Sequence, residues 1–159
     1  MENTKYKNFT LGLALFDALP VLFFSASMIL IATHFESTSF IIGAILCSLA
    51  GCGKVIWKII VAARNKDIHV LNTQMRILMP VGFILMIIGV MLNRSHIHLQ
   101  NAFTFPNILF FLITILGMIC MSVFAAKLDS TKVKSNWIEQ ITNAIAQFSF
   151  LIGVIVTIL

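Results

Sequence analysis

Five long apolar stretches, at residues 9–32, 39–62, 77–92, 107–126 and 137–159, constrain what this chain of 159 residues can fold into. Four of them reach the ~20 residues that a helix needs to cross ~30 Å of hydrocarbon, and the third is shorter. Lipid offers no partner to backbone N–H and C=O groups, so stretches that cross it must be helical. The sequence predicts an all-α integral membrane protein, a single polytopic domain over residues 1–159 with about five transmembrane helices.

The composition excludes the main soluble classes. Charged residues make up 11% of the chain, against about 25% in a soluble domain, so a soluble enzyme or a disordered tail is excluded. The net charge of +5 comes from basic residues between the apolar stretches, which indicates membrane orientation and not nucleic-acid binding. Cys47, Cys52 and Cys120 all lie within apolar stretches and form no disulfide framework. We therefore expect the lipid bilayer as the main partner and no nucleic acid.

The basic residues also predict the orientation. Cytoplasmic loops of membrane proteins carry an excess of Lys and Arg. With five spans, one side of the membrane carries nine basic residues, and Arg94 is alone on the other. The nine are Lys5, Lys7, Lys58, Arg64, Lys66, Arg76, Lys127, Lys132 and Lys134. This asymmetry predicts a multi-pass protein of the cell membrane with its N-terminus in the cytoplasm and its C-terminus outside.

Small residues recur at helical spacing and predict where the helices pack, because they let backbones approach closely in lipid. The second stretch has Gly43, Cys47 and Gly51 at steps of four. The third has a seam of methionine and glycine, and the fifth has a stripe of small side chains. The seam comprises Met75, Met79, Gly82, Met86, Gly89 and Asn93, and the stripe comprises Thr142, Ala146, Ser149 and Gly153. We interpret all three patterns as packing surfaces. Pro20 and Pro80 are expected to kink the first and third helices.

Two charges fall deep within the apolar stretches. Asp17 and Lys54 each lie about 12 Å from the cytoplasmic end of their helices, at 1.5 Å per residue. The two helices are joined by a short loop and are expected to be antiparallel neighbours. Opposite charges at equal depth predict an Asp17–Lys54 ion pair, either as a ligand site or as a structural pair that fixes helix register.

Three further polar residues complete the candidate ligand-binding set. Asn143 and Gln147 on the fifth stretch are expected to hydrogen-bond to the pair. Lys58 lies on the same helix face as Lys54 but closer to the membrane surface, which its side chain is expected to reach by extending along the helix. Glu139, three residues after Asn136, is expected to belong to a capping box that begins the fifth helix.

No catalytic motif is present: the chain lacks H-E-x-x-H, G-x-S-x-G and a P-loop. In the loop before the fourth stretch, His96 and His98 are two residues apart, on the same side of the membrane as His34 and Glu36. This pattern is weak, because loop histidines are usually solvated, so we expect no metal and no cofactor.

Three functions fit these observations. The first is a small membrane protein that binds or transports a small ligand or ion through a polar centre between helices. The second is an accessory or structural subunit of a larger membrane complex, as a homo-oligomer or beside a partner subunit. The third is an enzyme that modifies lipid headgroups, with the phosphate held by Lys54, Lys58 and the basic residues of the loop after the second stretch.

Overall fold

The computed structural model describes residues 10–64, 66–93, 102–129 and 132–158. Within these ranges the chain is all-helical, with five helical segments long and apolar enough to cross a membrane. This confirms the predicted all-α membrane bundle. His96 and His98, the two histidines of the weak loop pattern, lie outside the described residues.

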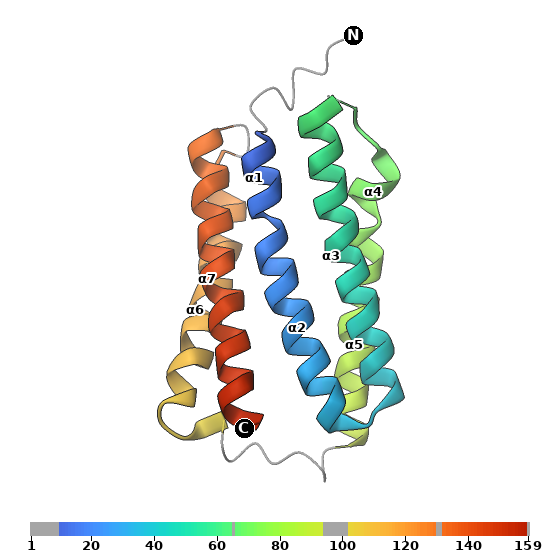
Figure 1. Ribbon diagram of the computed structural model, residues 1–159, viewed down its shortest axis with the longest axis vertical. Coiled ribbons are helices and arrows are strands. Elements are labelled where there is room, and N and C mark those ends of the chain that lie inside the picture. Colours follow the sequence, from blue (N-terminus) through green and yellow to red (C-terminus); the bar gives the residue numbers. More distant parts are fainter. Residues whose placement is uncertain (1–9, 65, 94–101, 130–131, 159) are drawn as a thin grey trace.

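The five spans contain seven helices (Figure 1). The first span is α1 (Leu11–Phe16) followed by α2 (Ala18–Phe35), the second is α3 (Thr38–Arg64), the third is α4 (His69–Thr73) followed by α5 (Met75–Leu92), the fourth is α6 (Asn107–Lys127), and the fifth is α7 (Val133–Ile158). The third span is longer than predicted, because α4 runs into α5 and together they cover His69–Leu92. The fifth begins at Val133, so Asn136 is inside the helix and the predicted capping box is wrong.

Helix α2 lies at the centre of the bundle, between α3 on one side and α7 on the other (Figure 1). Helix α5 packs along α3, and α6 packs along α7. Two aromatic contacts join α2 to the helices on either side of it. Phe23 contacts Phe148 of α7 with ring centroids 5.2 Å apart, and Phe24 contacts Phe83 of α5 with ring centroids 6.4 Å apart. The bundle is therefore two helix pairs assembled on one central helix.

The pair α3–α5 is held by the small residues that the sequence singled out. A Cβ atom on Gly43 would lie 2.5 Å from the carbonyl oxygen of Gly82, and one on Gly82 would lie 2.5 Å from Sγ of Cys47. Met86 and Gly89 of the predicted seam are buried. The predicted packing role of these residues is confirmed, and Gly51 instead faces Val21 of α2.

The pair α6–α7 uses the small stripe of the fifth span. The hydroxyl of Thr114 donates a hydrogen bond to the carbonyl oxygen of Ala146 at 3.2 Å, which links the two helices. A Cβ atom on Gly117 would meet Ala146, and one on Gly153 would meet Phe110 and Phe111. The stripe is a packing surface, as predicted.

The first span is locally irregular at Asp17, between α1 and α2, where the backbone keeps helical dihedral angles and the N–H still bonds to the carbonyl of Leu13. Pro20 explains the irregularity, because a proline has no N–H to donate to the carbonyl four residues earlier, here that of Phe16. Pro80, in contrast, lies inside α5. The third span has a similar irregularity at Gln74, where the helical hydrogen bonds also continue.

The odd number of spans places the start of α1 and the end of α7 at opposite ends of the bundle (Figure 1). The positive-inside rule predicts that α1 begins in the cytoplasm. A reporter that is active only in the cytoplasm should therefore work when fused before Met1 and fail when fused after Leu159. Activity at Leu159 with silence at Met1 would reverse the predicted orientation.

Candidate functional site

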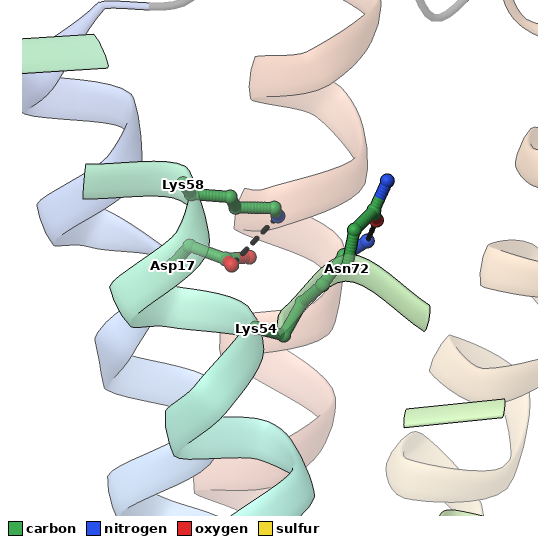
Figure 2. Close-up of polar contacts among 4 residues, drawn as sticks. All are labelled: Asp17, Lys54, Lys58 and Asn72. Carbon is green, nitrogen blue, oxygen red and sulfur yellow. Dashed lines mark hydrogen bonds and ion pairs between the residues drawn. The ribbon is translucent and has the colours of Figure 1, made fainter. Parts of the chain in front are cut away.

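Asp17, Lys54, Lys58 and Asn72 form a polar layer in the half of the bundle where α1 begins (Figure 2). Asp17 lies between α1 and α2 of the first span, the two lysines lie one turn apart on α3, and Asn72 lies on α4 of the third span. Helix α3 thus presents its lysines to the first and third spans.

Asp17 forms an ion pair with Lys58, with a distance of 2.6 Å between Oδ2 and Nζ. Both side chains are largely buried, with exposed fractions of 10% for Asp17 and 13% for Lys58. The predicted partner, Lys54, is one turn away on the same helix and makes other contacts. The expectation that Lys58 extends to the membrane surface is also wrong, because its ammonium group is held by Asp17.

Lys54 turns away from Asp17 and toward α4 (Figure 2). Its ammonium group donates a hydrogen bond to Oδ1 of Asn72 at 2.5 Å and lies 4.3 Å from the ring centre of Trp57. Both partners are neutral. A cation over an indole ring is attracted by the ring quadrupole, but this interaction does not cancel its charge.

The surroundings of Lys54 are fixed by two further hydrogen bonds. Nε1 of Trp57 donates to Oδ1 of Asp67 at 2.8 Å, which holds the indole ring in place. Nε2 of Gln74 donates to the carbonyl oxygen of Ala50 at 3.0 Å, which joins the third span to α3. The side chain of Gln74 also lies against Gly53 and would have to shift to make room for a larger residue there. Lys54 therefore lies between the fixed indole ring of Trp57 and a third span that is hydrogen-bonded to α3.

The predicted contributions from the fifth span are not seen. Gln147 donates from Nε2 to Sδ of Met118 on α6, at 3.5 Å. Asn143 is half-buried, and among the described residues its side chain makes no hydrogen bond to Asp17, Lys54 or Lys58. Glu139 of α7 lies within electrostatic range of Lys58. The polar layer is thus built mainly from the first three spans.

Sequence reasoning missed Asn72 and Gln74. Both lie in the loop between the second and third predicted stretches, and neither carries a charge. A signal was present, because both amide side chains lie within five residues of the apolar stretch that begins at residue 77. Among the described residues no group of three His, Cys, Asp or Glu side chains is arranged to hold a metal ion.

The fold and the polar layer define the class of this protein as a polytopic α-helical membrane protein with five spans. Comparison of the chain with protein-family models, with curated proteins and with solved structures finds no significant match. The class therefore rests on the helices and their packing.

Proposed function

We propose that this protein binds a small ligand or ion at the polar layer and transports it across the cell membrane. The observation that carries the proposal is the charge of Lys54. A charged side chain within a membrane span is costly and usually marks a functional site unless it is paired. Lys58 has a carboxylate partner, whereas the contacts of Lys54 are an amide oxygen and an aromatic ring.

The contacts that join α3 to the first and third spans support the same proposal. Ionisable side chains that face the interior of a membrane bundle mark ligand and ion pathways in many membrane proteins. Asp17 of the first span and Asn72 and Gln74 of the third all contact α3. We assign the ligand-binding role to Lys54 and its surroundings, with Asn143 and Gln147 as candidates on the transport path from the fifth span.

A second candidate function is an accessory subunit of a larger membrane complex. The buried Asp17–Lys58 pair favours this reading, because a short and well-covered ion pair fixes the register of two helices without any ligand. The two functions differ in what they require of Lys54. A subunit has no need for its charge, whereas a binding protein depends on it.

A stability screen separates the two functions. A ligand that binds the folded state raises its unfolding temperature. Purified protein should be heated with inorganic cations and anions, carboxylates, amines and phosphate esters, in parallel with the Lys54→Met variant. We expect at least one compound to raise the unfolding temperature of the parent by several degrees and to leave Lys54→Met unchanged. If no compound has this effect on a well-folded parent, the accessory subunit becomes the better explanation.

A further inference from the structure

We propose that Lys54 and Arg76 bind one phosphate-type anion at the end of the bundle where α3 ends and α5 begins. The anion is the phosphate of a lipid headgroup or a soluble phosphate. This inference rests on the proposed function and names the chemistry of its ligand.

Among the described residues, Lys54 and the charged groups within electrostatic range of it carry more positive than negative charge. Lys58 and Arg76 are the cations in range, and Asp17 and Asp67 are the carboxylates. Asp17 is engaged by Lys58, and Asp67 accepts a hydrogen bond from Trp57. An anion between Lys54 and Arg76 would be attracted by both of their charges.

The side chain of Lys54 extends toward the end of the bundle where α3 ends. The backbone of Lys54 lies ten residues before the end of α3, but the side chain reaches Asn72. Asn72 is on α4, and Arg76 follows it by four residues, so both lie on the same face of the third span. An anion that enters the bundle from this end would meet both Lys54 and Arg76.

The donor groups fit phosphate better than a carboxylate. An ammonium group has three N–H donors, and Asn72 takes one of those of Lys54. The guanidinium group of Arg76, which is exposed on the first turn of α5, has five donors in a planar fork. Such a set can serve the several oxygens of a phosphate. Figure 2 shows that the amide nitrogen of Asn72 points away from Lys54, so Asn72 positions Lys54 through its oxygen alone.

Trp57 provides a direct readout, because Lys54 lies over its ring. The chain has two tryptophans, so Trp137→Phe leaves Trp57 as the single source of indole emission. This protein, in detergent and stripped of lipid, should be titrated in one arm with inorganic phosphate, with chloride as the control. In the other arm the titrant is dioctanoyl phosphatidic acid, with dioctanoylglycerol as its phosphate-free control.

We expect a saturable change in Trp57 emission in at least one arm. A response to inorganic phosphate identifies a soluble anion, and a response to phosphatidic acid alone identifies a lipid headgroup. Lys54→Met should weaken binding at least about tenfold, Arg76→Gln should weaken it less, and Lys54→Arg should retain it because the charge is kept. Lys134→Met, which removes an exposed cation from the first turn of α7, is the matched control and should change nothing.

Three results would overturn the inference: no saturable change in either arm, equal binding by the parent and Lys54→Met, or an equal loss in Lys134→Met. If Lys54→Met fails to fold, Lys54→Arg still tests the inference, because this variant keeps the charge and is expected to fold and to bind. If neither arm responds but the stability screen finds a Lys54-dependent ligand that is not a phosphate, the proposed function stands and the phosphate inference falls.

Discussion

Lys58→Met is expected to lower the free energy of unfolding by about 3–5 kcal/mol, the cost of leaving a buried charge without its partner. The short side chain of Asp17, inside the first span and 10% exposed, would be left without its cationic partner. Asp17→Asn should cost less, because the long side chain of Lys58 can extend to the membrane surface. Chemical unfolding in mixed detergent micelles measures both losses.

The double variant Asp17→Asn/Lys58→Met tests whether the two residues are coupled. It should regain part of the stability that the single variants lose, because no unpaired charge remains. Asp17→Asn combined with Lys127→Met, at an exposed position in the last turn of α6, is the matched control, and those two losses should add to within about 0.5 kcal/mol. Simple addition for Asp17 and Lys58 would show that the ion pair contributes nothing to the fold.

Gly43→Ala is expected to destabilise the bundle by about 1–3 kcal/mol, the usual cost of adding atoms to a well-packed contact. The added Cβ would lie 2.5 Å from the carbonyl oxygen of Gly82 and 2.9 Å from the backbone nitrogen of Met86, so the backbones of α3 and α5 must separate. Thermal unfolding in detergent would show the loss.

Gly12→Ala is the matched control for this prediction. No neighbouring atom lies within 4 Å of the position that its Cβ would take. Alanine favours a helix over glycine by up to about 1 kcal/mol, so this variant should be as stable as the parent or slightly more stable. A similar gain in Gly43→Ala would mean that α3 and α5 do not approach as closely as described.

The number of spans was predictable because lipid imposes one requirement on every crossing segment: enough apolar length in a helix. The packing surfaces were predictable for a related reason, since few residues other than glycine let backbones touch. The ends of the spans were less predictable. The third span gained a short helix because polar side chains such as Asn72 and Gln74 find partners on α3 and need not stay in water.

The partner of Asp17 could not be predicted, and the register of the first hairpin shows why. If the two antiparallel helices are paired symmetrically about the turn at Glu36 and Ser37, Asp17 lies opposite position 56 of α3. Lys54 and Lys58 are each two residues from that position, about 3 Å along the helix, and both side chains can reach. Helical side chains lean toward the N-terminus of their helix, which brings Lys58 to the level of Asp17. The hydrogen bond to Asn72 then keeps the ammonium group of Lys54 away from Asp17.

The central place of α2 has a consequence for biosynthesis. This helix is made before the two pairs that assemble on it, α3–α5 and α6–α7. A nascent chain that has reached Leu92 already contains one complete half of the bundle, while the side of α2 that will receive α7 still faces lipid or the insertion machinery. If the helices pack in the order in which they are made, assembly proceeds outward from the first span, and the pair α6–α7 completes the bundle.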